Sequence, residues 1–561
     1  MTGTRSWPAS PSPEAERLPP PWQAAAWLLL VALPWLVPPQ RPPSVALLPW
    51  LCALGCTASL TLLARPRLPL WLCAALLLAA ALAAWPVATA RDGLWLALVA
   101  SLTVLALGAA ALRSGGPQAL ALRAEWVAAA WLAAALASAV IGLCQYFQVE
   151  HHVWFMSEAP GREPYGNLRQ RNHYATLLNI GLAALLWLAA RSTPTRRALL
   201  ATLGAAALLV TAQAATGSRT GLLQLLALTA AAAWWWRPAL GPLRGLVVAL
   251  PLGYALATVL LPLLAGLEPG QSGILARLQP NGMACATRWT LWRDAWELAL
   301  ARPWTGWGWG ELDYAHFVTE FDHPRHCELI DNAHNLPLHL AVEFGLPLAA
   351  LALGVLLMLA WRQARGLRTD AVRQLGAVVL GLLLLHSLLE YPLWYGPFQM
   401  AAGLALGLLL RPPAAPAAAR PARSARCAGL IAAVLLALGG WAAWDYLRTS
   451  QVYVLPAQRW APYRADALAQ ARRTWFFGPQ ARFAELSLTP LTPQTAAHVH
   501  ELALQSLHYT PEPRVVEALI GSARLLGREE EARHYERLYR AAYPRGYARW
   551  QAQNGQQSPP R

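Results

Sequence analysis

Residues Arg288 to Pro347 read RWTLWRDAWELALARPWTGWGWGELDYAHFVTEFDHPRHCELIDNAHNLPLHLAVEFGLP. This stretch is the largest polar interruption in a chain of otherwise mostly apolar segments. It begins with a Trp-rich amphipathic segment, passes a Gly/Trp turn and reaches His334, after which an apolar helix is predicted to begin. An imidazole can exchange a proton at neutral pH, so a His where a polar loop meets a membrane helix is a candidate for proton transfer at the membrane surface.

The composition indicates an integral membrane protein. The chain has 561 residues, of which 56% are hydrophobic and 13% are charged, whereas soluble domains carry about 25% charged residues. The formal net charge of +16 comes from Arg residues that lie mostly in short loops, where they set membrane topology. We therefore expect a lipid bilayer as partner and no nucleic acid.

Apolar runs of about 17–25 residues predict spanning helices. We predict an all-α polytopic fold with about 12–13 of them, near residues 22–38, 44–64, 68–86, 93–112, 124–147, 173–190, 197–214, 220–236, 244–265, 335–360, 373–391, 396–411 and 427–445. The resulting division is a cytoplasmic tail (1–21), helices 1–9 (22–265), a large periplasmic loop (266–334), helices 10–13 (335–445) and a periplasmic helical domain (446–561). Residues 497–508, 513–526 and 529–543 have helical periodicity, and their Ala and Leu spacing suggests a tetratricopeptide-like repeat.

The placement of Arg residues predicts the orientation. With the N-terminus inside, the even-numbered connections carry most of the loop Arg residues, which agrees with the positive-inside rule. The loop before His334, the loop 165–173 and the turn 217–220 then all lie outside. Arg169, Arg171 and Arg219 lie in these outer loops against the trend. Each could simply contact a lipid headgroup, but together with His334 they suggest a common pocket.

Phosphate recognition is one use for these Arg residues. Arg is always charged and can bind phosphate oxygens through two parallel hydrogen bonds. Arg219 and Arg288 each adjoin a predicted helix start, where backbone amides also favour anions. We expect both to bind a diphosphate, with Arg169 or Arg171 assisting.

Several carboxylates could assist His334. Asp331 and Glu343 lie near it in sequence and could orient its ring. Glu390 follows His386 by four residues on one predicted helical face. Ionisable groups in a membrane segment are costly and usually have a function, although His386 and Glu390 could instead form a purely structural pair.

The amphipathic segment and the cysteines give two further predictions. Trp289, Trp292, Trp296 and Leu300 share one face of a predicted helix, which either lies at the membrane interface or packs on the bundle. Cys285 and Cys327 both fall in the outer loop, and an oxidising periplasm would favour a disulfide between them. The remaining cysteines lack metal-ligand spacing, so we expect no metal site and no cofactor.

The ordered motifs resemble the O-antigen ligase and polymerase superfamily. They are Gln170-Arg171-Asn172-His173, Gly217-Ser218-Arg219-Thr220-Gly221, and Ala333-His334-Asn335 before Glu343-Phe344-Gly345. Within it, residues 386–395 (HSLLEYPLWY) and the helical C-terminal domain resemble PglL-type protein O-oligosaccharyltransferases. The family often has Pro after the Gln of the first motif, where this chain has Arg171.

The resemblance implies a glycosyltransferase of the bacterial inner membrane whose active site faces the periplasm. The donor would be an oligosaccharide on undecaprenyl diphosphate, and the acceptor a Ser or Thr hydroxyl of an exported protein such as a pilin. His334 would assist deprotonation of the hydroxyl, and Arg219 and Arg288 would stabilise the leaving diphosphate without a metal. We expect supporting roles for Gln170, Asn172, Asp331, Asn335, Glu390 and Tyr391.

Two alternatives stay open at this stage. The first is the same chemistry on another acceptor: ligation of O-antigen to lipid A-core, or polymerisation of repeat units. The second is a polysaccharide or lipid transporter, which would distribute ionisable groups through the middle of the membrane.

Overall fold

The computed structural model describes residues 20–38, 42–66, 68–90, 92–149, 156–193, 195–268, 270, 273–278, 284–410 and 421–557. The regular structure in these ranges is helical, apart from an isolated bridge between Asp92 and Phe477. Eight described helices are long and apolar enough to cross a membrane, and four shorter helices are also apolar. The chain is an all-α polytopic membrane protein, as the sequence predicts.

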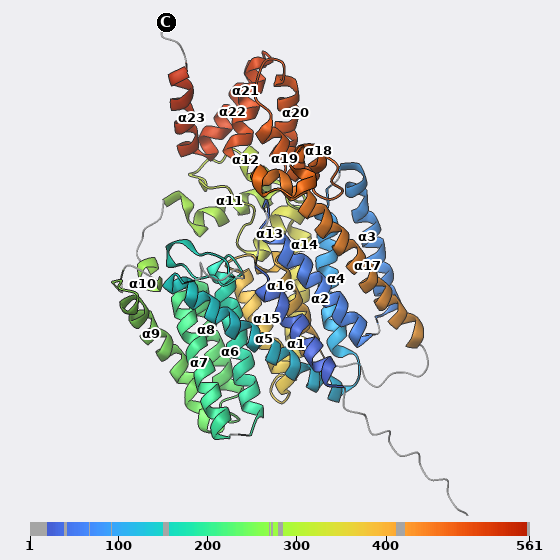
Figure 1. Ribbon diagram of the computed structural model, residues 1–561, viewed down its shortest axis with the longest axis vertical. Coiled ribbons are helices and arrows are strands. Elements are labelled where there is room, and N and C mark those ends of the chain that lie inside the picture. Colours follow the sequence, from blue (N-terminus) through green and yellow to red (C-terminus); the bar gives the residue numbers. More distant parts are fainter. Residues whose placement is uncertain are drawn as a thin grey trace, which may run out of the picture.

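The helices form a bundle beneath a cap (Figure 1). We call the cap the part built from α11, α12 and the C-terminal helices α18 to α23, whose bounds are given below. The bundle contains α1 (Pro21–Leu36), α2 (Leu47–Ala64), α3 (Leu70–Ala90), α4 (Leu94–Arg113), α5 (Pro117–Phe147), α6 (Arg171–Arg191), α7 (Arg196–Ala215), α8 (Arg219–Trp235), α9 (Leu246–Leu264), α14 (Leu346–Ala364), α15 (Ala371–Ser387), α16 (Gly396–Leu409) and α17 (Pro421–Thr449). The outer loop adds α10 (Gly273–Leu278), α11 (Arg288–Ala301), α12 (Leu312–Val318) and α13 (Leu336–Phe344). The C-terminal domain contains α18 (Ala467–Ala471), α19 (Gly478–Leu488), α20 (Ala496–Leu507), α21 (Pro513–Leu525), α22 (Glu529–Ala542) and α23 (Pro544–Gln557).

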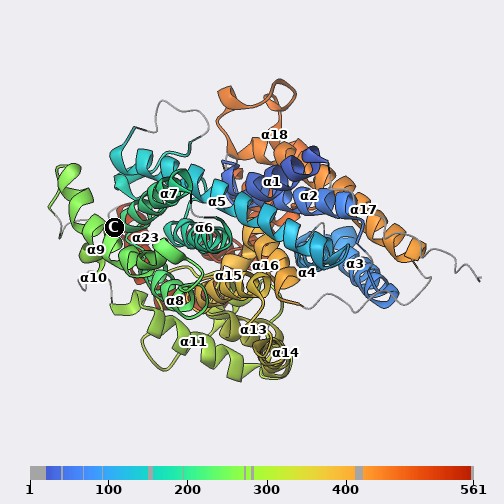
Figure 2. The same ribbon diagram turned by 90° about the horizontal axis from the view of Figure 1, so that it is seen from below.

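Helix α6 lies at the centre of its half of the bundle, between α5, α7, α8 and α15 (Figure 2). Residues 173–187 of α6 are all buried, so neighbouring elements enclose this stretch of the helix on every side. Small residues allow its close contact with α5: a Cβ at Gly181 would lie 2.2 Å from the Cβ of Ala135. In lipid, where apolar surroundings offer no hydrophobic drive, such close packing stabilises helix pairs.

The predicted helix at 335–360 is in fact two helices, α13 and α14, separated at Gly345. Gly345 has φ +85°, and a Cβ there would lie 2.7 Å from the backbone of Trp304. A side chain fits neither the backbone conformation nor the space, so the chain breaks at the glycine. Similarly, α15 ends at Ser387 rather than at 391, which places Glu390 in a loop beyond the spanning helix.

The outer loop and the C-terminal domain share a hydrophobic core. Phe317 of α12 is 1% exposed and packs with side chains from α19 to α22. Next to it, the His508 ring stacks on Tyr314 at 4.0 Å, and His508 Nδ1 lies 2.8 Å from Glu311 Oε2. The three predicted C-terminal helices correspond to α20, α21 and α22; their tetratricopeptide-like repeat stays a prediction.

Candidate active site

Glu390 is the centre of a polar cluster at the end of the bundle that faces the cap. Its Oε2 lies 2.7 Å from His334 Nδ1. Its Oε1 accepts hydrogen bonds from Asn172 Nδ2, at 2.9 Å, and from Arg288. Gln170 Nε2 donates to Oε2 at 3.4 Å. Residues from α6, from the start of α11 and from the turn before α13 therefore converge on one carboxylate, which is 4% exposed.

His334 lies in a turn that presents its ring to Glu390. Its φ is +50°, a left-handed conformation that is uncommon for a non-glycine residue and often marks a functional site. The backbone N–H of His334 donates to Asn332 Oδ1 at 2.9 Å, and the ring meets Tyr391 edge-on, with centroids 4.9 Å apart. An ionised carboxylate only accepts hydrogen bonds, so Nδ1 carries the proton and Nε2 keeps a lone pair that can accept one.

The surroundings keep Glu390 ionised. Burial alone would raise its carboxyl pKa, but the hydrogen bond from His334 and the positive charge of Arg288 outweigh burial and lower the pKa. A carboxylate that holds the tautomer and orientation of an imidazole is the arrangement of a general base.

The four predicted phosphate-binding Arg residues differ in what they contact. Arg288, whose side chain is 41% exposed, pairs with Glu390. Arg171 pairs with Glu163 at 3.0 Å. Arg169 and Arg219 are exposed, and no partner is recorded for either side chain among the described residues. The two unpaired guanidinium groups are thus available to an anionic ligand.

Ser218 connects the Arg219 segment to the His334 cluster. Its hydroxyl donates to Asn172 Oδ1 at 2.6 Å and also caps α8 by accepting the Gly221 N–H at 2.9 Å. Through Asn172 and Glu390, a chain of hydrogen bonds therefore runs from the residue before Arg219 to His334. Segments of three predicted motifs therefore meet around Asn172 and Glu390, while the common pocket of Arg169, Arg171 and Arg219 with His334 stays a prediction.

Two predicted carboxylate partners of His334 differ from the observed one. Asp331 is exposed, and no contact between it and His334 is recorded in the described part of the chain. Glu343 lies beside His339 instead, and Asn335 caps α13 by accepting the Leu338 N–H. His386 does not use its side chain to bind Glu390; its Nδ1 lies 2.8 Å from Thr176 Oγ1. Proximity in sequence did not predict the partner of His334. Because α15 ends at Ser387, Glu390 lies in a loop that reaches the turn carrying His334.

Helix α11 combines the two arrangements left open by its sequence. Trp289, Trp296 and Leu300 are 77%, 49% and 50% exposed, which suits an interfacial face. Trp292 does not share this exposure: its indole N–H donates to the carbonyl oxygen of Ala333 at 3.1 Å. The helix thereby supports the turn that carries His334.

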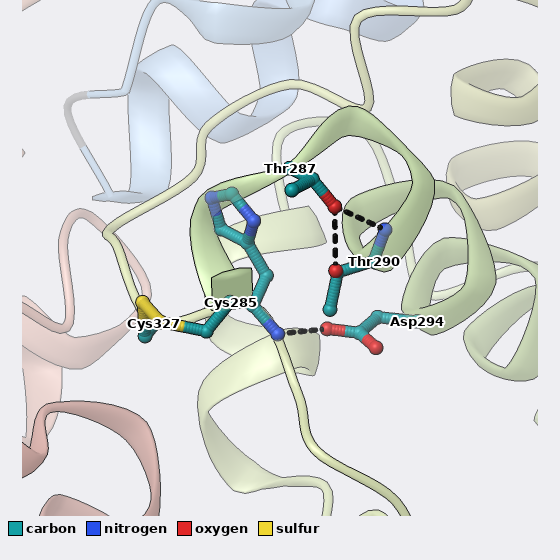
Figure 3. Close-up of a disulfide and its surroundings, with 6 residues drawn as sticks. Cys285, Thr287, Thr290, Asp294 and Cys327 are labelled. Carbon is teal, nitrogen blue, oxygen red and sulfur yellow. Dashed lines mark hydrogen bonds between the residues drawn. A yellow bond between two sulfur atoms is a disulfide. The ribbon is translucent and has the colours of Figure 1, made fainter. Parts of the chain in front are cut away.

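Cys285 and Cys327 form a disulfide that joins the start of α11 to the segment before His334 (Figure 3). Beside it, Asp294, which is fully buried, accepts the His326 N–H at 2.7 Å and lies 2.9 Å from His316 Nε2. Burial lowers the pKa of His316 to about 4, although its bond with Asp294 opposes the shift. Among the described residues no group of His, Cys, Asp and Glu has the geometry to hold a metal ion.

We expect the double variant Cys285→Ser/Cys327→Ser to be destabilised by about 2–4 kcal/mol, because the cross-link closes a loop of 42 residues. Thermal unfolding of the purified protein in detergent, with and without dithiothreitol, measures this. Reductant should lower the Tm of the wild type and of Cys144→Ser, whose altered thiol is free, but should leave the double variant unchanged. A Tm that ignores reductant in all three would contradict the prediction.

Three protein families match parts of the chain, in an order that follows its motifs. "Protein glycosylation ligase" covers residues 164–189, "O-Antigen ligase" covers 204–353, and "Virulence factor membrane-bound polymerase, C-terminal" covers 374–557. These ranges contain Asn172, Arg219, His334 and Glu390. The chain is therefore similar, range by range, to PglL-type ligases and to the O-antigen ligase and polymerase superfamily.

A curated relative is similar to a larger part of the chain. The general O-oligosaccharyltransferase of Acinetobacter baylyi (strain ATCC 33305 / BD413 / ADP1) is 24% identical over 374 residues. The alignment covers 66% of this chain and 64% of the relative, so the chain spans less than two thirds of the relative's length.

Some residues of the site were missed in the sequence. The sequence places Ser218 only in the motif around Arg219, and it groups Trp292 with Trp289 and Trp296 on one helix face without separating its role from theirs. The pair His339 and Glu343 carried a usable signal, since residues four apart on a helix lie on one face. No sequence signal indicated that Trp292 would turn inward, because this depends on the path of the loop above it.

Proposed function

We propose that the protein transfers a glycan en bloc from undecaprenyl diphosphate to Ser or Thr hydroxyls of exported proteins, such as a pilin. The reaction would take place at the periplasmic face of the bacterial inner membrane. The observation that carries the proposal is the cluster around Glu390, which holds a proton acceptor, His334, beside a guanidinium, Arg288. The relative's description as an O-oligosaccharyltransferase supports the choice of a protein acceptor.

The proposed reaction is a direct displacement. His334 Nε2 accepts the proton of the acceptor hydroxyl while its oxygen attacks the anomeric carbon. The bond from that carbon to the phosphate oxygen breaks, and the electron pair leaves with the polyprenyl diphosphate. One displacement inverts the anomeric configuration. Arg288, Arg219 and Arg169 lie in the outer loops where they would neutralise the departing charge, an electrostatic role that the proposal assigns to guanidinium groups rather than to a metal.

A reconstituted assay tests the proposal. Purified protein would be mixed with undecaprenyl-diphosphate-linked oligosaccharide and either a pilin peptide or lipid A-core, and glycosylated products would be identified by mass spectrometry. We expect glycan on the peptide. Glycan only on lipid A-core, or only longer lipid-linked glycan, would favour a ligase or polymerase instead, functions that the O-antigen ligase and polymerase matches make the second candidate. Lipid-linked glycan moved across vesicles without transfer would indicate a transporter.

Arg219 gives a sharper prediction about the donor. We expect Arg219→Ala to lower kcat/KM for the donor by about 10–100-fold, the loss that corresponds to one or two charge-assisted hydrogen bonds to phosphate. Arg219→Lys should recover part of the loss, because Lys keeps the charge but not the two-bond geometry. Transfer kinetics at varied donor concentration measure both effects.

Arg197 provides the matched control for Arg219. It is also an exposed Arg near a helix start, but α7 begins at the opposite end of the bundle from the cap (Figure 1). Arg197→Ala should leave kcat/KM unchanged. Equal losses in both variants would mean that general surface charge, and not a donor site, explains the effect.

A further inference from the structure

The backbone of the turn before His334 is held from two sides. Ala333 is fully buried. Its carbonyl oxygen accepts from the Trp292 indole, as described above, and its N–H donates to His339 Nδ1 at 3.4 Å. Both backbone polar groups of Ala333, the residue before His334, are therefore paired with side chains, one on α11 and one on α13. Such contacts fix the direction in which the His334 ring points.

His339 can accept the Ala333 N–H in only one of its protonation states. A neutral imidazole has one donor and one acceptor nitrogen, so Nδ1 accepts only if Nε2 carries the proton. His339 Nε2 lies 3.3 Å from Glu343 Oε2, and both side chains are 1% exposed. Neither atom makes a hydrogen bond in the described part of the chain, so a small rotation of either side chain would let the Nε2 proton satisfy both atoms.

Glu343 is itself fixed by the Gly/Trp turn, which comprises residues 306–310. Its Oε1 accepts the Gly310 N–H at 3.0 Å, and its backbone oxygen accepts the Gly308 N–H at 2.9 Å. A Cβ at Gly306 would lie 2.3 Å from the Glu343 backbone, so the turn lies directly against the end of α13. The carboxylate thus has one oxygen for the turn and one for His339.

We propose that His339 is a positioning residue for His334, and that Glu343 sets the tautomer that lets it act. The inference rests on the proposed function, because it assigns His334 the role of proton acceptor. No hydrogen bond joins His339 to Glu390 in the described part of the chain; His339 instead accepts the backbone N–H of Ala333, the residue before His334. The site then contains two carboxylate–imidazole pairs in series, Glu390 with His334 and Glu343 with His339.

The test compares His339→Phe with His339→Asn in the full-length protein. Phe fills the space but removes the acceptor, whereas Asn Oδ1 stands where Nδ1 stood and can accept the Ala333 N–H. We expect His339→Phe to lower kcat about tenfold, the factor for one lost hydrogen bond, with KM for donor and acceptor unchanged. His339→Asn should retain kcat within about twofold by the same reasoning.

Hydrogen exchange gives a readout that does not need activity. Peptides covering residues 331–335, followed by mass spectrometry, should exchange faster in His339→Phe than in wild type, and at the wild-type rate in His339→Asn. If the wild type transfers no glycan, the proposed function fails, yet this exchange pattern still decides the positioning role. Equal exchange and equal kcat in wild type and His339→Phe would overturn the inference.

Glu343 is tested by a double-mutant cycle. The carboxylate of Glu343 has two acceptor oxygens, whereas the Gln amide has only one. In Glu343→Gln, either the Gly310 N–H or the His339 Nε2–H would therefore face the amide NH₂ group, which is itself a donor. We expect it to lower kcat with His339 present and to have a smaller effect with His339→Asn, because Asn has no tautomer to set. Additive losses would mean that Glu343 acts through the Gly/Trp turn alone, and would refute its role through His339.

Discussion

Replacement of His334 by Ala is expected to lower kcat for glycan transfer by about 10²–10⁴-fold, the usual contribution of a positioned general base. The variant keeps the pairing of Glu390 with Arg288 and Asn172 but removes the atom that we propose as acceptor of the hydroxyl proton. Because the ring is partly exposed and binds through one nitrogen, we expect the fold to survive. Single-turnover transfer to a pilin peptide, with Tm in detergent as the measure of folding, gives both quantities.

His534 provides the control for this variant. It is an exposed His on α22, a helix of the C-terminal domain. His534→Ala should transfer glycan at the wild-type rate. If His334→Ala remained within tenfold of wild type at an unchanged Tm, His334 would have no place in the mechanism.

Glu390→Gln is expected to lower kcat by about 10²-fold or more. All four recorded side-chain partners of Glu390 approach it as donors, and an amide must turn its NH₂ toward at least one of them. If that partner is His334, the imidazole must reverse its tautomer and loses the lone pair at Nε2. If it is Arg288, a buried contact becomes repulsive. Transfer rates and Tm should therefore both fall.

Glu485 is the matched control, because it too binds an Arg and a His. Arg472 donates to both of its oxygens, at 2.9 and 2.8 Å, and His498 Nε2 lies 2.8 Å away. Glu485→Gln should lower Tm without changing kcat, since these contacts lie in the C-terminal domain. Equal effects of the two substitutions on kcat would mean that Glu390 serves the fold and not the reaction.

The lowered pKa of Glu390 also predicts a pH dependence. A carboxyl group with a lower pKa in the folded protein stabilises it fully above the unfolded value, which is about 4.3 for Glu. This stabilisation is lost as the pH falls through the lowered pKa. Between wild type and Glu390→Gln, the difference in Tm should therefore be constant near neutrality and shrink only in acid.

Much of this architecture follows from hydropathy. The helical class and most helix limits correspond to the predictions, whereas the predicted pocket of Arg169, Arg171, Arg219 and His334 stays a prediction. The break at Gly345 was missed because an apolar run on both sides of a glycine has the same hydropathy as one long helix. The partner of His334 could not be identified, because Asp331 and Glu343 are nearer in sequence and only tertiary packing favours Glu390.

The shared core around Phe317 has a practical consequence for engineering. A chain shortened after α17 would leave α12 with its buried aromatic face in water, and α12 leads directly to the segment that carries His334. Chimaeras between relatives should therefore exchange the outer loop and the C-terminal helices together. A substitution at the shared core in one segment would otherwise meet side chains in the other that do not pack against it.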